Sequence, residues 1–222
     1  MQIDFHAHIL PRADHGSNGI ETSLKQVELA RQAGIEILAA TPHFYPATDT
    51  AEAFLERRKH CHDELMSKLG KDRPEILLGA EVQLCKGLDH LSQIRELCFR
   101  GTDVILLELP GDFRYSHYAR TIEAIKYDLK MKIVFAHVDR YPDLAADLIE
   151  AGYMAQLNAS SLCTLLRNRR LYRWIEQGSV VALGSDLHGV ETGYSQFLRA
   201  KTKLGPLYDQ IMSRTAQVLG RG

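Results

Sequence analysis

The sequence predicts an α/β fold in which seven strand–helix units form a mostly parallel sheet. Short apolar runs alternate with longer amphipathic stretches along the whole chain, which is the pattern of consecutive βα units. Glycine directly follows several amphipathic stretches, at Gly34, Gly152 and Gly178, where it commonly ends a helix. The sheet is either open or closed, and seven units in 222 residues suit a compact barrel slightly smaller than the eight-unit form.

The strands are predicted where four to six mostly apolar residues stand together, as in Gln-Ile-Asp-Phe near the start and Ser-Val-Val-Ala-Leu-Gly near the end. In chain order they are 2–5, 35–40, 75–80, 103–108, 132–136, 153–157 and 179–184. The helices are predicted where apolar residues recur at helical spacing between these runs. They are 21–33, 49–69, a weaker one at 88–98, 116–130, 142–151, 160–177, 194–203 and 206–219.

The composition is that of an ordinary globular domain, with 45% apolar residues, 25% charged residues and a net charge of −1. There is no basic excess to favour nucleic acid as a partner. No apolar run approaches the roughly 18 residues of a membrane span, and the first residues lack the pattern of a secretory signal. Four scattered cysteines without a C-x-x-C pair fit reduced thiols. We therefore expect one cytoplasmic domain over residues 1–222, whose oligomeric state is open.

Two histidines lie two residues apart at the end of the first predicted strand. In extended chain, residues i and i+2 point the same way and lie roughly 6.6–7 Å apart. His6 and His8 can therefore converge on one metal ion at about 2.0–2.1 Å each. Taken alone, the pair reads more readily as two solvated histidines at a strand end. The other strand ends decide between these interpretations.

A histidine, aspartate or glutamate stands at the end of six of the seven predicted strands. Parallel strands bring their carboxyl ends to one edge, where the functional groups of such folds gather. Only the sixth strand, ending at Gln156-Leu157-Asn158, lacks a strong metal ligand. The ligand-type residues at the other ends are His6, His8, His43, Glu81, Glu108, His137, Asp186 and His188. The loop after the first strand adds Asp14 and His15, although aspartate is also a common turn residue.

This mixed imidazole and carboxylate set, without thiolate, favours Zn, Mn or Fe over a structural cysteine-rich zinc site. Taken without Asp14, the set is six histidines with Glu81, Glu108 and Asp186. These nine ligands are too many for one ion, so we expect a multinuclear hydrolytic site in which Glu81 and Glu108 bridge ions. Three divalent ions carry about +6 against about −3 from Glu81, Glu108 and Asp186. The excess favours an anionic substrate, above all a phosphate ester, attacked by a metal-bound water of lowered pKa.

These residues resemble the PHP (polymerase and histidinol phosphatase) superfamily and, within it, the CpsB/CapC branch of bacterial manganese-dependent protein-tyrosine phosphatases. The likeness runs in family order over residues 1–190. Its texts are Asp-Phe-His-Ala-His-Ile-Leu-Pro-Arg-Ala-Asp-His-Gly, Ala-Thr-Pro-His, Gly-Ala-Glu-Val, Leu-Glu-Leu-Pro, Ala-His-Val-Asp-Arg-Tyr, Gln-Leu-Asn-Ala-Ser-Ser-Leu and Gly-Ser-Asp-Leu-His. The resemblance implies a distorted (β/α)7 barrel of PHP type. It also implies hydrolysis of phosphotyrosine in proteins of capsule or exopolysaccharide systems, such as the tail of a tyrosine autokinase.

The resemblance also implies a trinuclear site with two to three divalent ions, Mn before Fe or Zn. One ion would be held by His6, His8, Glu81 and Asp186, and a second by Glu81, Glu108 and His137. A third would be held by His43, His188 and the residue before the loop glycine. That residue is His15 here, where the family usually has aspartate. Asp14 then supports a ligand, or ligates in place of His15.

Arg140, in Ala-His-Val-Asp-Arg-Tyr, matches a family arginine that holds the substrate phosphate, and a guanidinium fork suits bidentate phosphate binding. His43 or His188 is expected to handle the leaving-group proton. The chain departs from the family at Gly193, where a second phosphate-binding arginine is common. This departure bears on substrate affinity and leaves the metal ligands unaffected.

Three other interpretations are compatible with parts of the sequence. The same ligands would serve a histidinol-phosphate phosphatase or another enzyme acting on small phosphate monoesters. The domain could also be a non-catalytic regulatory module that retains metal for folding. A cysteine-dependent phosphatase is disfavoured, because the segment between Cys163 and Arg169 has no glycine to form a phosphate loop and lies in a helical pattern.

Overall fold

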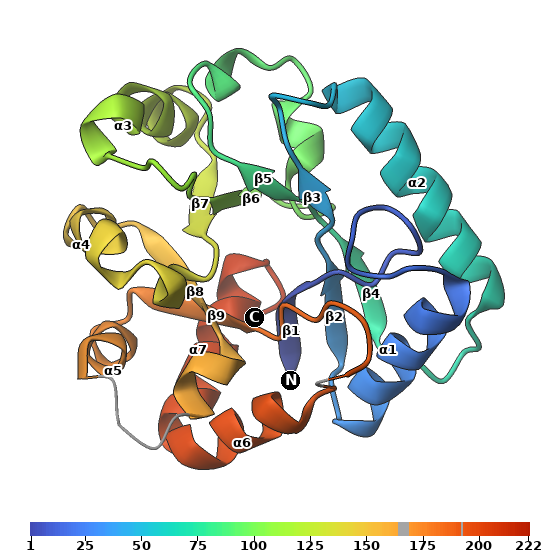
Figure 1. Ribbon diagram of the computed structural model, residues 1–222. Helices are drawn as coiled ribbons and strands as arrows, with labels where there is room; N and C mark the ends of the chain where they lie inside the picture. Colours follow the sequence, from blue (N-terminus) through green and yellow to red (C-terminus); the bar gives the residue numbers. More distant parts are fainter. Residues whose placement is uncertain (164–168, 192) are drawn as a thin grey trace.

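The computed structural model describes residues 1–163, 169–191 and 193–222. Its strands occupy the middle of the molecule and its helices surround them (Figure 1). The strands are β1 (Ile3–Ala7), β2 (Ile37–Ala40), β3 (His43–Phe44), β4 (Glu75–Leu78), β5 (Glu81–Gln83), β6 (Val104–Glu108), β7 (Lys132–Phe135), β8 (Met154–Asn158) and β9 (Val180–Gly184). The helices are α1 (Ile20–Gln32), α2 (Ala51–Lys68), α3 (Tyr115–Glu123), α4 (Pro142–Glu150), α5 (Arg169–Glu176), α6 (Ser195–Leu204) and α7 (Pro206–Val218).

The described strands pair in parallel in two sheets, with the orders β1-β2-β4 and β3-β5-β6-β7-β8-β9. Strand β3 follows β2 directly in the chain, and β5 follows β4. The backbone therefore crosses from the first sheet to the second at these two places. The ends of the strand order meet where the Asp186 N–H donates to the His6 carbonyl (2.8 Å) and the His8 N–H donates to the Leu187 carbonyl (3.2 Å). This is the distorted (β/α)7 arrangement that the sequence predicts, split between two ladders.

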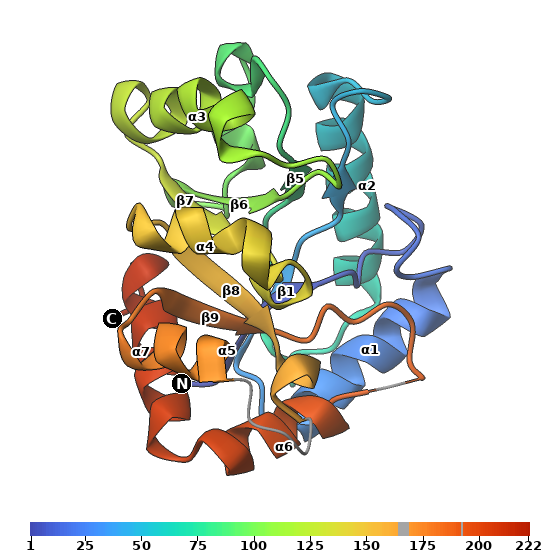
Figure 2. The same ribbon diagram turned by 60° about the vertical axis from the view of Figure 1, so that its left-hand side comes forward.

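The alternation of apolar runs and amphipathic helices explains the layers. Every residue of β1 and β9 is buried, as expected for strands covered on both faces. Thr50 caps helix α2: its side chain accepts a hydrogen bond from the Ala53 N–H (3.2 Å) and so satisfies one free donor of the first turn. Figure 2 shows α3, α4 and α5 in succession along β7, β8 and β9. The buried strands therefore position the ends that carry the ligand-type residues.

The predicted helix at 88–98 is wrong. The structure has two short 3₁₀ turns there, η1 (Leu88–His90) and η2 (Ile94–Leu97). Leucine or isoleucine recurs every three residues from Leu88 to Leu97, which is the period of a 3₁₀ helix rather than of an α-helix. The predicted helix at 116–130 begins as α3 and ends in a π-helical turn, Ala124–Asp128.

The predicted helix at 160–177 is only partly observed. A 3₁₀ turn, Ala159–Cys163, precedes residues 164–168, which lie outside the described residues, and α5 follows them. The segment that links Cys163 to Arg169 is therefore not described. Over the described ranges, none of the helices is both long and apolar enough to span a bilayer.

Candidate metal centre

The structure gathers the predicted ligands at the carboxyl ends of the strands. His6, His8, Glu81 and His137 are completely buried, and His43 is nearly so. Potential ligand atoms cluster as three overlapping groups among the described residues: His6, His8 and Glu81; His43, Glu81 and Glu108; and His8, His43 and His188. Glu81 belongs to two groups, as expected for a bridging carboxylate.

The group of His6, His8 and Glu81 has the geometry of ligands to one ion. The two Nε2 atoms are 3.1 Å apart, and they lie 3.2 Å (His6) and 3.3 Å (His8) from Glu81 Oε2. Two ligands bound at about 2.0–2.1 Å with an angle between about 90° and 109° at the metal lie roughly 2.8–3.4 Å apart. Asp186 Oδ1 lies slightly farther out, 3.4 Å from His8 Nε2 and 3.7 Å from His6 Nε2.

Several buried atoms of the site have no hydrogen-bond partner among the described residues. Glu81 Oε2, Glu108 Oε2 and His43 Nδ1 are among them. His43 Nδ1 approaches Glu81 Oε2 to 2.9 Å, but the two atoms lie outside hydrogen-bond geometry. Buried polar atoms are costly without a partner. Because potential ligand atoms of His43, Glu81 and Glu108 lie within 4.8 Å of one another, a divalent cation is a partner that this donor set fits.

Electrostatics in the site couple carboxylates to imidazoles. Burial alone would raise the pKa of Glu81, but His6, followed by His137 and His43, outweighs burial and holds this pKa well below its usual range. Burial would lower the pKa of His6, but Glu81 and then Asp186 reverse the effect and raise it. Burial and the neighbouring Glu81 raise the pKa of Glu108. Metal ions compete with protons for such ligands, so metal binding is expected to release protons here.

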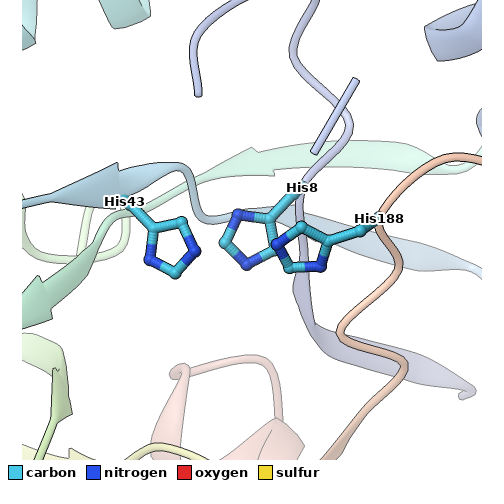
Figure 3. Close-up of side chains that lie close together, drawn as sticks. All are labelled: His8, His43 and His188. Atoms are coloured by element: carbon cyan, nitrogen blue, oxygen red, sulfur yellow. The ribbon is translucent and has the colours of Figure 1, made fainter. Parts of the chain in front are cut away.

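His8, His43 and His188 bring their rings side by side (Figure 3). The His8 ring centroid lies 4.1 Å from that of His188 and 4.4 Å from that of His43. The exposed His15 ring lies 4.8 Å from both His43 and His188, but His15 is in none of the three ligand groups. The groups thus differ from those implied by the resemblance, with His8 beside His43 and His188, and with His43 beside Glu81 and Glu108.

His137 also faces the carboxylates. Its Nε2 lies 2.6 Å from Glu81 Oε1 and 3.7 Å from Glu108 Oε1, so it adjoins the pair of carboxylates with which the resemblance groups it. Its backbone has φ of +30°, and Asp186 has φ of +51°. Left-handed backbone is uncommon outside glycine and tends to occur at functional sites.

Asp14 supports the ligands. Its carboxylate accepts hydrogen bonds from His8 Nδ1 (2.6 Å), the Gly16 N–H (2.8 Å) and the His43 N–H (3.0 Å). Burial would raise the pKa of Asp14, but His8 outweighs it and the pKa is lowered. The bond to Nδ1 turns His8 Nε2 toward Glu81 and Asp186, which is the usual way a carboxylate orients a metal-binding imidazole.

Arg140 reaches the edge of the site from the turn that follows β7. Its guanidinium contacts Asp186 Oδ2 and remains about half exposed. Gly193 has a left-handed backbone (φ of +48°) and brings no side chain to the site. Arg140 therefore places a guanidinium beside the predicted ligand Asp186.

Three supporting residues were missed by sequence reasoning. Gln156 and Asn158 on β8 are buried against His6 and Asp186. Asp4 is buried behind them and accepts from the Ser185 N–H (2.9 Å) and from the Tyr194 hydroxyl (2.7 Å). The sequence does carry a signal for them, because polar residues at i and i+2 of a buried strand point to the same side. Asp4 has this spacing with His6, and Gln156 has it with Asn158.

Comparisons with known proteins agree with this fold. The family described as capsular polysaccharide synthesis, CpsB/CapC, matches residues 2–214. A chain from the crystal structures of YwqE from Bacillus subtilis and CpsB from Streptococcus pneumoniae, metal-dependent tyrosine phosphatases, superposes with a TM-score of 0.77. It shares 21% identity, and the match covers 100% of this chain and 96% of that one. No curated protein sequence gives a match.

More distant structures share the fold. A TatD family hydrolase from Entamoeba histolytica matches with a TM-score of 0.61 and 9% identity, covering 98% of this chain and 97% of that one. A β-aspartyl dipeptidase from Fervidobacterium islandicum matches with a TM-score of 0.52 and 12% identity, covering 98% and 74%. The family match over nearly the whole sequence is decisive: this chain belongs to the CpsB/CapC family of capsular polysaccharide synthesis proteins.

Proposed function

We propose that this chain is a metal-dependent phosphatase that hydrolyses phosphotyrosine in a protein of a capsular polysaccharide system. The observation that carries the proposal is the convergence of buried imidazole and carboxylate lone pairs on Glu81, with Arg140 at the rim. Phosphotyrosine as substrate follows from the family and from the tyrosine phosphatases with which the fold superposes. A segment of a tyrosine autokinase is a suitable partner.

Two to three divalent ions are proposed, with manganese preferred. His6, His8, Glu81 and Asp186 would hold one ion. Glu81 and Glu108 would hold a second with His43 or His137, and His43 and His188 would hold a third with His8 or His15. When bound, such ions stabilise charge on phosphoryl oxygens and lower the pKa of water.

The charges of the chain favour phosphate as the ligand. Three carboxylates cannot neutralise three divalent ions, so the loaded site attracts an anion. The Arg140 guanidinium forms an ion pair with Asp186 Oδ2, and its exposure allows it to turn toward a bound phosphate. His188 is partly exposed in the same region and is suited to manage the leaving-group proton, with His43 as the alternative. Water is the proposed nucleophile, and no phosphoenzyme is required.

A cavity of about 380 Å³ beside the ligands suits the aryl group. Tyr45 lines it with its ring nearly parallel to His43, at a centroid distance of 5.1 Å. Arg57 ties its two walls together by donating to the Ala13 carbonyl (3.1 Å) and to Asp49 (2.5 Å). Burial, followed by Glu108 and Glu81, raises the pKa of Tyr45 to about 12, so its hydroxyl stays neutral.

Replacing Tyr45 by alanine is therefore expected to reduce discrimination between aryl and alkyl phosphates. Loss of an aromatic contact costs about 0.5–1.5 kcal/mol beyond buried area, so kcat/KM for a phosphotyrosyl peptide should fall by about threefold to tenfold. The value for a phosphoseryl peptide should change little. Tyr45→Phe, which keeps the ring, serves as the control, and equal losses on both peptides would contradict an aryl subsite.

Arg140→Ala is expected to raise KM for phosphate monoesters and leave metal content unchanged. A charged hydrogen bond contributes about 1.5–3 kcal/mol, so kcat/KM should fall by roughly tenfold to a hundredfold. Arg140→Lys keeps the charge without the bidentate fork and should recover part of the loss. Metal analysis of each variant checks the assignment, and loss of metal from Arg140→Ala would mean that Arg140 acts on Asp186 instead.

The test of the proposed function is turnover by metal-depleted and Mn²⁺-reconstituted protein. A phosphotyrosyl peptide and histidinol phosphate are compared at equal concentration, and the bound metal is quantified. We expect activity only after reconstitution and preference for the peptide. Full activity in chelator, preference for histidinol phosphate, or trapping of a covalent phosphocysteine or phosphohistidine would overturn the proposal.

A further inference from the structure

Two amide side chains at the end of β8 form a continuous hydrogen-bonded chain between His6 and Asp186. Gln156 Oε1 lies 3.2 Å from His6 Nδ1 and accepts from the His137 N–H at 2.7 Å. Gln156 Nε2 donates to Asn158 Oδ1 at 3.0 Å, and Asn158 Nδ2 donates to Asp186 Oδ2 at 2.9 Å. Gln156 is completely buried, and Asn158 is nearly so.

The direction of every bond in this chain is fixed by one backbone group. The His137 N–H can only donate, so the Gln156 atom facing it must be the carbonyl oxygen. The Gln156 NH₂ then faces Asn158, which must present its own oxygen there. The Asn158 NH₂ is consequently turned toward Asp186, whose carboxylate can only accept.

The same constraint determines the tautomer of His6. Because Gln156 Oε1 is an acceptor, the hydrogen of a neutral His6 must lie on Nδ1. This leaves the lone pair on Nε2, the atom that faces Glu81 Oε2 at 3.2 Å. At the other end, Asn158 Nδ2 donates to Asp186 Oδ2, and Oδ1 is the oxygen that lies 3.4 Å from His8 Nε2 and 3.7 Å from His6 Nε2.

β8 also fixes the turn that carries Arg140. The Asn158 N–H donates to Asp139 Oδ1 at 2.7 Å, and Asp139 immediately precedes Arg140 in the turn Val138–Arg140. The strand without a metal ligand of its own thus contacts elements that supply His6, His137, Asp186 and Arg140. If Gln156 and Asn158 only filled the core, apolar side chains would serve there without the desolvation cost of two buried amides.

We infer that Gln156 and Asn158 are positioning residues of the metal centre: as a directional amide relay they hold His6 in its Nε2-binding tautomer and present Asp186 Oδ1 to the same ion. The inference rests on the proposed function for the presence of the ion. It adds that the metal affinity of His6 and Asp186 depends on β8, and that the two ligands are coupled through it.

The test compares Gln156→Met and Asn158→Leu with the unaltered chain. Both variants keep side-chain length or shape and remove the relay. Co²⁺ affinity is measured by absorption titration, and the His6 tautomer is read from ¹⁵N shifts of the Zn²⁺-loaded protein. Loss of outer hydrogen bonds to metal ligands costs about 10–100-fold in affinity, and we expect that loss in both variants. Gln177→Met, which alters an exposed glutamine, is the matched control and should bind as the unaltered chain does.

The outcomes separate the inference from the function on which it rests. If the unaltered chain binds no Co²⁺ and has no metal-dependent activity, the proposed function fails. If it binds Co²⁺ and both relay variants bind equally well with an unchanged His6 tautomer, the relay is refuted.

Gln156→Glu covers the case in which Gln156→Met does not fold. It keeps the acceptor for His6 and the His137 N–H but cannot donate to Asn158. We expect it to preserve the Nδ1–H tautomer of His6 and to weaken the Co²⁺ affinity that depends on Asp186. A changed tautomer in Gln156→Glu would overturn the directional argument.

Discussion

Glu81→Ala is expected to abolish metal binding and to lower kcat/KM by at least about a thousandfold. Glu81 Oε2 lies 2.9–3.3 Å from nitrogen atoms of His6, His8 and His43, and Oε1 lies 2.6 Å from His137 Nε2. No other described carboxylate belongs to two of the ligand groups. Metal ions supply several kcal/mol of transition-state stabilisation, and each 1.36 kcal/mol is about tenfold in rate.

Two further variants and a check of folding serve as controls for Glu81→Ala. Glu81→Gln keeps the shape and removes the charge, so it should also lose metal if the carboxylate is the bridge. Glu56→Ala, at an exposed position on α2 away from the ligands, should retain the metal content and turnover of the unaltered protein. Metal analysis is made on gel-filtered protein with circular dichroism as a check of folding. A folded Glu81→Ala protein with full metal content and activity would refute the bridging role.

The fold was accessible from the sequence because its βα units are regular. All seven predicted strands occur, and six of them end near a predicted metal ligand. Parallel strands direct their carboxyl ends to one edge, so the sequence alone predicts that residues as distant in the chain as His6 and His188 lie at one site. The resemblance added Arg140, which lies on a short 3₁₀ turn, Val138–Arg140, that the apolar pattern does not predict.

Other features of the site depend on three-dimensional packing and are harder to predict from the sequence. Which potential ligands lie together depends on side-chain direction: His8, His43 and His188 form one group, and the His15 ring lies 4.8 Å from those of His43 and His188. Gln156 and Asn158 are weak ligands, and their importance lies in the direction of their hydrogen bonds. At 88–98 the apolar residues recur with a period of three, and the structure has 3₁₀ turns there in place of the predicted α-helix.

Two glycines, Gly16 and Gly184, lie against His8 and His6. The sequence alone gives no reason to select them. A Cβ built at Gly16 would lie 2.1 Å from His8 Cβ and 2.8 Å from the His8 carbonyl oxygen. A Cβ built at Gly184 would lie 2.6 Å from His6 Cβ and 2.7 Å from Gln156 Nε2. Three of these four contacts involve backbone or Cβ atoms, which a rotamer change cannot move, so the ligands themselves must be displaced.

Gly16→Ala and Gly184→Ala are therefore each expected to cost about 1–3 kcal/mol of folding stability, the usual cost of overpacking, and to reduce metal affinity as well. Gly16→Ala should be the more damaging, because its N–H also binds the Asp14 carboxylate that orients His8. Gly70→Ala is the control, since a Cβ there meets nothing within 4 Å. Chemical denaturation of the metal-free proteins measures the steric cost, and Co²⁺ titration of the folded fraction measures the displacement of the ligands. If Gly184→Ala lost stability but bound Co²⁺ as tightly as the Gly70→Ala control, the predicted link between the position of His6 and metal affinity would be wrong.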